Sequence, residues 1–236
     1  MWRLFNRFYA DVTREMFAED LAWKRDVILC RDSGDGELRG FSTLALFRRV
    51  VDGRKVVAIF SGDTIIEPEY WGQTALQRQF FLYILKQKAR HPFSRVYWFL
   101  ISKGYKTYLL LSRNFVEYWP RWDRPTPTWQ ANVIGHMASE LYGEAWQPGL
   151  GVLRFTESKG RLREAVAPIE PSLLAHDDIR FFAEKNPGHA GGDELCCLGR
   201  VDPVLAISYS VKLLGKLGKR VVRPLLPAPA PESPPR

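Results

Sequence analysis

Cysteine is scarce in this chain: the 236 residues contain three, and two of them, Cys196 and Cys197, are adjacent. An odd count with this spacing provides neither a disulfide framework nor a set of zinc ligands, so we expect a reducing compartment and no metal. No uncharged run is long enough to cross a bilayer, and the first fifteen residues carry five charged side chains, which leaves no room for the apolar core of a signal peptide. We therefore expect a cytoplasmic protein.

Acidic residues are missing from Tyr70 to Val116, a stretch that contains eight Lys and Arg residues. The whole chain carries a net charge of +8 and has a pI near 9.5. Such a surface attracts nucleic acid, anionic lipid or acidic protein without selecting one of them, and a basic surface with no partner explains the same numbers. A polyanion bound near residues 70–116 would meet no carboxylate supplied by that stretch.

The segment from Lys55 to Ile66 is apolar at both alternating sets of positions, which predicts a strand buried inside a sheet. A polar triplet, Ser61-Gly62-Asp63, interrupts it and predicts a bulge, with Asp63 on the face of Ile59 and Ile65. The loop 67–74 follows, and then apolar residues recur at helical spacing up to Arg90. Free N–H groups at such a helix start form an anion site suited to a phosphate or pyrophosphate.

The runs Ile65–Leu76, Arg95–Ile101 and Lys106–Phe115, in the order strand end and loop, strand, helix, resemble the acyl-CoA-binding core of the GNAT acyltransferase superfamily. The resemblance spans residues 55–119, about a quarter of the chain. It implies a mixed α/β fold with a mostly antiparallel central sheet flanked by helices, extended by an α-rich C-terminal part. It also implies an N-acyltransferase whose donor is an acyl-CoA or acyl-carrier-protein thioester and whose acceptor is an amine.

In that family the loop after the central strand binds the pyrophosphate of the donor. The resemblance therefore assigns donor binding to Trp71, Gly72, Gln73, Thr74, Ala75 and Arg78. An apolar channel for a long acyl chain is expected from six residues that are equally suited to a core, namely Phe80, Phe81, Leu85, Phe99, Leu109 and Leu111.

Catalysis of acyl transfer needs a base, which family members often place as a carboxylate on the central strand. Asp63 is the carboxylate inside that strand, and burial there would raise its pKa; the alternative is that Asp63 only caps the bulge. Ser61 is expected to hold a water or the acceptor, and His189 is a second candidate base or simply a surface histidine. The position of the tyrosine that often serves as acid falls on Leu110, while Tyr108 is expected to pack in the core.

Other segments complete the expected elements. Helices are predicted at 2–20, 105–114, 129–146, 176–184 and 204–222, and strands at 24–30, 38–50, 95–102, 116–119, 150–156 and 193–201. The last strand would bring the glycine-rich loop 186–192 next to the catalytic cleft.

The expected divisions are a core over 1–122, an extension over 123–222 that completes the sheet and cleft, and a proline-rich disordered tail over 223–236. The segment 204–222 is basic and amphipathic, so it either makes peripheral contact with an anionic membrane or lies on the core. We expect no specific nucleic acid partner. The alternative to an enzyme is a non-catalytic protein of the same fold that binds nucleic acid or an anionic membrane through its basic face.

Overall fold

The computed structural model describes residues 1–71, 73–156, 161–163, 168–202 and 204–205. The chain divides into two compact units, Met1–Val201 and Asp202–Arg236. In the second unit, the Leu205 amide donates to Asp202 Oδ1 at 3.0 Å, and the predicted helix 204–222 and the tail otherwise lie outside the described residues. The first unit contains the expected core and residues 123–201 of the expected extension.

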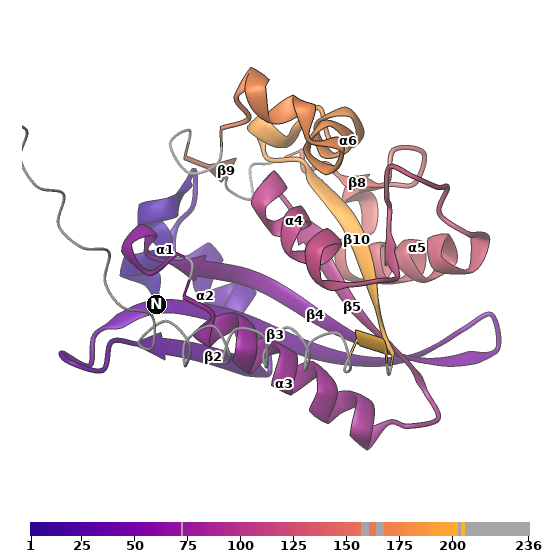
Figure 1. The fold of residues 1–236 in the computed structure, drawn as a ribbon, viewed down its shortest axis with the longest axis horizontal. Helices are drawn as coiled ribbons and strands as arrows, with labels where there is room; N and C mark the ends of the chain where they lie inside the picture. Colours follow the sequence, from indigo (N-terminus) through magenta and orange to yellow (C-terminus); the bar gives the residue numbers. More distant parts are fainter. Residues whose placement is uncertain (72, 157–160, 164–167, 203, 206–236) are drawn as a thin grey trace, which may run out of the picture. The chain divides into compact units, whose positions relative to one another are not determined.

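A mixed sheet forms the centre of the first unit, in the order β2-β3-β4-β5-β10-β8-β7, with β6 paired to β10 (Figure 1). The bounds are β2 Asp26–Arg31, β3 Leu38–Val51, β4 Arg54–Ile66, β5 Arg95–Ser102, β6 Tyr118–Trp119, β7 Trp146–Gln147, β8 Val152–Leu153 and β10 Glu194–Val201. Its pairs are antiparallel except β4 with β5. The expected mixed α/β fold with a mostly antiparallel sheet flanked by helices is confirmed.

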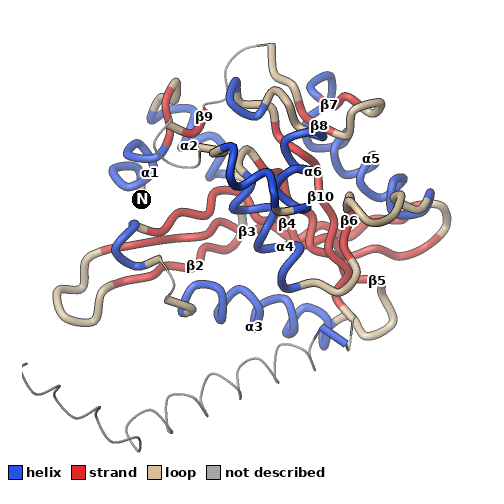
Figure 2. The backbone as a smooth tube through the Cα atoms, turned by 45° about the horizontal axis from the view of Figure 1, so that its top comes forward, coloured by secondary structure: helices blue, strands red, loops and turns tan. Residues whose placement is uncertain are grey.

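The helices cover both faces of this sheet, and α3 and α5 lie on opposite sides of it (Figure 2). Their bounds are α1 Trp2–Phe8, α2 Arg14–Ala22, α3 Ala75–Arg90, α4 Tyr105–Asn114, α5 Thr128–Tyr142 and α6 Asp177–Lys185. The described residues of the unit also form a short pair, β1 Tyr9–Ala10 with β9 Arg161–Leu162, and four 3₁₀ turns: Pro68–Tyr70, Gly143–Ala145, Pro171–Ala175 and His189–Gly191. None of the described helices has the length and apolar character needed to cross a bilayer.

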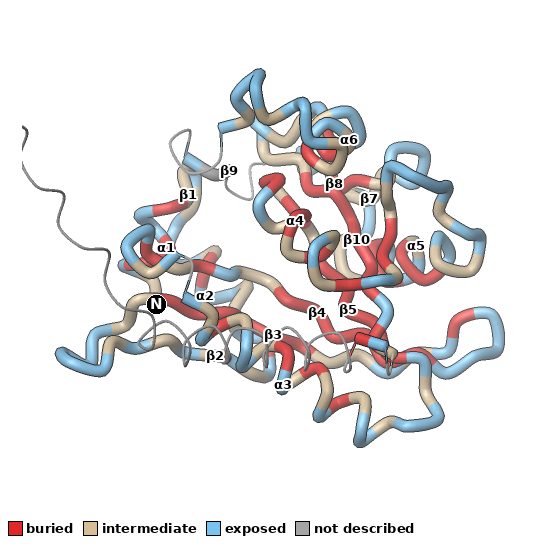
Figure 3. Tube along the Cα trace, in the orientation of Figure 1, coloured by how far each residue is buried: buried red, intermediate tan, exposed pale blue. Residues whose placement is uncertain are grey.

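Burial is concentrated in the central strands (Figure 3). Val56 to Phe60 of β4 are all at most 2% exposed, as expected of a strand covered on both faces. One face packs on α5 through a cluster that includes Phe60, Phe99 and Met137, and further along on α1 and α2 through Ile65 and Phe41. The other face carries Trp98, which contacts Phe80 of α3 and Phe115 after α4.

The single helix predicted over residues 2–20 is wrong. Two helices form instead, because Asp11 adopts φ 58°, outside the helical region, and Thr13 accepts a hydrogen bond from the Met16 amide at 3.2 Å and so begins α2. The apolar stripe that suggested one helix is shared between both, and it packs on Phe41 and Ile65 of the sheet.

Candidate functional site

The predicted bulge lies on β4. Ser61 pairs with Leu44 and Thr64 pairs with Ser42, so Gly62 and Asp63 together face the single residue Thr43. A bulge of this kind shifts the alternation of side chains along the strand. Ser61 precedes the bulge and stays on the face of Ile59, the α3 side, where its hydroxyl accepts from Trp98 Nε1 at 2.8 Å. Asp63 is shifted to the opposite face, toward α2, so the expectation that it shares the face of Ile59 is wrong.

The same position is where β4 and β5 part. Their parallel pairing runs from Val56 opposite Arg95 to Ser61 opposite Leu100, while β4 continues beside β3 to Ile66. A cavity of about 1180 Å³ lies at this opening, and its lining includes Asp63, Gln77 of α3, Lys106 of α4 and Glu194 of β10. Clefts of this size hold small molecules and cofactors.

Lys24 lies at the base of this cavity between two carboxylates. Its side chain is 2% exposed, and Nζ lies 3.2 Å from Asp63 Oδ2 and also forms an ion pair with Asp20. Burial raises the pKa of the Asp63 carboxyl above its usual value of 3.8, and the Lys24 ammonium opposes that rise. A Cβ added to Gly62 would stand 2.4 Å from Lys24 Nζ, so only glycine leaves room for the lysine here.

A second ion pair lines the same cavity. Lys103 Nζ, at the end of β5, lies 3.4 Å from Glu194 Oε1 and 5.4 Å from the centre of the Tyr9 ring. Burial raises the pKa of Glu194, with Lys103 acting against the rise. Burial, and then the charges of Asp63 and Glu194, raise the pKa of Tyr9, which keeps its hydroxyl protonated.

Sequence reasoning missed four of these residues: Lys24, Lys103, Glu194 and Tyr9. The signal for Glu194 was a carboxylate at the start of an otherwise apolar strand. The others gave no signal, because the pairing of Lys24 with Asp63 joins residues 39 positions apart and depends on how α2 meets the bulge. The loop 186–192 was predicted to lie next to the cleft, but none of its residues lines the cavity; Glu194, which follows the loop, does.

The predicted helix after the central strand begins at Ala75. Its first backbone bond runs from the Arg78 amide to Thr74 O at 2.8 Å, and among the described residues no acceptor takes the amides of 74–77. The amides of Trp71 and Gln73 are engaged within the loop by Pro68 O and Tyr70 O. Gly72 lies outside the described residues.

Side chains of this turn border the cavity. Trp71, Gln73 and Gln77 line it, and Lys106 Nζ lies 4.2 Å from the centre of the half-exposed Trp71 ring. Arg113 of α4 also lines the cavity, so this wall carries two cations. Arg78 is exposed and does not belong to the lining.

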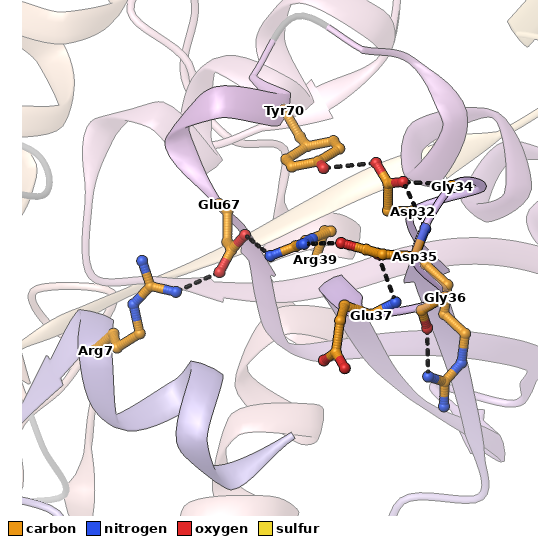
Figure 4. Close-up of polar contacts among 10 residues, drawn as sticks. Arg7, Asp32, Gly34, Asp35, Gly36, Glu37, Arg39, Glu67 and Tyr70 are labelled. Atoms are coloured by element: carbon orange, nitrogen blue, oxygen red, sulfur yellow. Dashed lines mark hydrogen bonds and ion pairs between the residues drawn. The ribbon is translucent and has the colours of Figure 1, made fainter.

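A polar network holds the loop that precedes α3 in place (Figure 4). Glu67, which is buried, pairs with Arg7 of α1 and accepts from Arg39 of β3 at 3.4 Å. Tyr70 donates to Asp32 of the β2–β3 turn at 2.6 Å, a bond that raises the pKa of the tyrosine. Three segments, α1, β3 and the β2–β3 turn, therefore hold residues 67–70 in place.

Several predicted residues lie away from the cavity. Ser61 is 5% exposed, forms a hydrogen bond with Trp98 and does not line the cavity. His189 lies 2.9 Å from Asn186 O, packs on Phe182 and does not line the cavity either. The six residues predicted for an acyl channel are also absent from the lining, because Phe99, Leu111 and their neighbours pack in the core. Tyr108 is in the core as expected, with its hydroxyl on Pro120 O at 2.9 Å, and Leu110 lines the cavity.

Comparison with known proteins gives limited similarity. No family model and no curated protein sequence matches the chain. Among solved structures, N-acetylglutamate synthase from Neisseria gonorrhoeae, in complex with coenzyme A and N-acetyl-glutamate, is 16% identical with a TM-score of 0.32, and the match covers 51% of this chain and 25% of that one.

Two further structures are similar at the same level. An Enterococcus faecalis protein described as a probable N-acyltransferase is 14% identical with a TM-score of 0.35 over 85% of this chain and 61% of its own. Saccharomyces cerevisiae N-myristoyltransferase with bound myristoyl-CoA is 13% identical with a TM-score of 0.30, and the match covers 63% of this chain and 34% of that one. Scores this low do not transfer an activity, so the chain's own residues have to carry the function.

Proposed function

We propose that this chain is an N-acyltransferase that moves an acyl group from a phosphopantetheine thioester to an amine. The supporting observation is that one cavity is bordered both by the start of α3 and by Asp63 on the bulge of β4. The start of α3 suits the phosphate arm of a donor, and Asp63 suits proton removal. Both border the cavity that opens where β4 and β5 part.

The donor would place its diphosphate at the start of α3. The amides of residues 74–77 and the positive end of a 16-residue helix favour an anion there, and Lys106 and Arg113 of α4, which also line the cavity, add positive charge. The pantetheine arm would then run between β4 and β5 toward Asp63. Coenzyme A presents a diphosphate on its pantetheine arm and acyl carrier protein presents a single phosphodiester, so a binding assay with each distinguishes them.

In the reaction, the amine nitrogen attacks the thioester carbonyl carbon, the carbon–sulfur bond breaks, and the sulfur leaves as thiolate. The amine loses a proton during this step, and the ionised Asp63 carboxylate would accept it. Its raised pKa makes Asp63 a stronger base than an exposed aspartate, while Lys24 keeps a share of it ionised. Glu194 is the alternative base in the same cavity.

An acyl chain longer than acetyl is part of the proposal. The lining from α1 and α2 includes Phe5, Phe8 and Phe17 as well as the carboxylates of Glu19 and Asp20, and a hydrocarbon chain or an apolar acceptor would be buried against the three aromatic rings. This lining differs from the channel expected from sequence.

The test is binding followed by turnover. The thermal-shift experiment compares coenzyme A, a series of acyl-CoAs and an acyl-loaded carrier protein. We expect at least one of them to raise the melting temperature, as a ligand that binds the native state does. Mass spectrometry of ligands that copurify would identify the thioester. Absence of stabilisation by every donor, together with no thioester cleavage in the presence of amines, would refute the proposed activity.

A further inference from the structure

A surface distant from the cavity carries a different signature, at the end of the sheet where β4 and β5 begin. It is formed by the β3–β4 hairpin and by the loop between α3 and β5, which project at the same end in Figure 1. We call it the hairpin end and define it as residues 48–55 and 86–95. Arg48 Nη2 lies 3.5 Å from His91 Nε2, which joins the two segments.

Apolar side chains protrude from the hairpin end. Phe93 is 101% exposed and follows Pro92, and Val50 on the hairpin is 63% exposed. A phenylalanine with no protein contact on its side chain gains nothing from folding and adds apolar surface in water. Phe93 lies in a turn and Val50 lies near the end of β3, next to the β3–β4 turn.

Cations are numerous in the same two segments. The exposed ones are Arg48, Arg54, Lys55, Lys86, Arg90 and Arg95. Arg54 and Arg95 stack on the Trp129 ring, with guanidinium carbons 5.0 and 5.4 Å from its centre, so their positions are fixed. Asp52 is the single acidic residue of the two segments, and its carboxylate accepts from Asn132 at 2.8 Å.

We propose that the hairpin end docks on an anionic lipid bilayer, with Phe93 inserted among the head groups and the basic side chains on lipid phosphates and carboxylates. An apolar tip ringed by cations is the combination that interfacial binding uses, since insertion and electrostatic attraction add. Nucleic acid would use the cations but gives no role to Val50 and Pro92.

Docking in this way leaves the cavity open. Asp63 lies about eight residues along β4 from Lys55, which is about 25 Å at the rise of a strand, and the hairpin end contributes no residue to the lining. The inference therefore does not depend on the proposed activity.

The test uses the full chain and vesicle flotation, with phosphatidylcholine vesicles compared with vesicles that also contain phosphatidylserine. We expect binding to the anionic vesicles only, weakened roughly tenfold by Phe93→Ala because the buried ring is lost. Leu150→Ala, at a residue 54% exposed in the turn before β8, is the matched control and should bind as the parent does. Arg90→Glu should weaken binding at least tenfold, and Lys185→Glu on α6 should not.

Other outcomes would overturn the inference. The inference is wrong if the protein binds both vesicle types equally or binds neither. It is also wrong if Phe93→Ala and Arg90→Glu bind as the parent does, a result that would point to the basic segment 204–222. Retention on DNA that Arg90→Glu abolishes and Phe93→Ala leaves intact would make the surface one for nucleic acid. Melting curves of the variants should match the parent, because both side chains are exposed.

Discussion

Replacing Lys24 with methionine removes the cation that two carboxylates share where β4 and β5 part. At an effective dielectric constant of about 20, unit charges 3.2 Å apart attract by about 5 kcal/mol. The desolvation of Lys24 and the residual 18% exposure of Asp63 offset part of this, so we expect the free energy of unfolding to fall by about 2–4 kcal/mol. For a unit of this size the melting temperature should drop by about 5–15 °C.

The stabilisation by Lys24 should depend on pH in one direction. Lys24 favours the ionised carboxylate, so its contribution is present above the pKa of Asp63 and is lost as the pH falls through that pKa. Circular dichroism melts of parent and Lys24→Met should therefore converge in acid and diverge toward neutral pH. The pair Lys24→Met with Asp63→Asn should recover most of the loss, and Lys185→Met serves as the control.

Melting temperatures that agree within a degree or so at neutral pH, or a loss of stability that is the same at every pH, would refute the reasoning. Either result would mean that the ion pair contributes nothing and that Asp63 is not held by Lys24.

Three further predictions concern the site and its support. Asp63→Asn should lower kcat by about 10²–10⁴ and remove the fall of kcat/KM in acid, which lies at higher pH than for an ordinary aspartate because burial raises its pKa. Lys106→Ala should raise the KM for the donor about tenfold with kcat retained. Gly199→Ala should cost about 1–3 kcal/mol of stability, because a Cβ would stand 2.7 Å from Leu111 Cδ1 and 2.8 Å from Phe115 Cδ1.

Steady-state kinetics with the donor that the thermal-shift comparison selects, and thermal melts for Gly199→Ala, check these values. Asp178→Asn and Lys185→Ala are the matched controls, since neither residue lines the cavity. Full activity in Asp63→Asn would move the role of base to Glu194, to be examined with Glu194→Gln.

Local pattern was enough to predict most elements of the sheet. Strands 24–30, 38–50, 95–102 and 193–201 and the helix ending at Arg90 all form, because their apolar periodicity and flanking turns agree with the packing that follows. The break at residues 9–13 escaped prediction, because the apolar stripe continues across it although the backbone is extended at Tyr9 and Thr13 and has φ 58° at Asp11.

The candidate site was predictable only where it is local. The bulge at Gly62-Asp63 and the helix start after the loop follow from neighbouring residues, but the bulge also moves Asp63 to the face opposite Ser61, which simple alternation cannot foresee. Lys24, Lys103 and Glu194 come together through tertiary contacts among α2, β5 and β10. Their partners are far away in the chain, so spacing carried no information about them.

The most direct measurement is a titration of an acyl-CoA into isotope-labelled protein, followed by the backbone amide signals in two-dimensional NMR. If the start of α3 binds the diphosphate, the amides of residues 74–77 should shift first and saturate with the donor, and Lys106→Ala should weaken the same shifts. Amides of 74–77 that stay in place while acyl-CoA binds elsewhere, or fails to bind, would contradict the account.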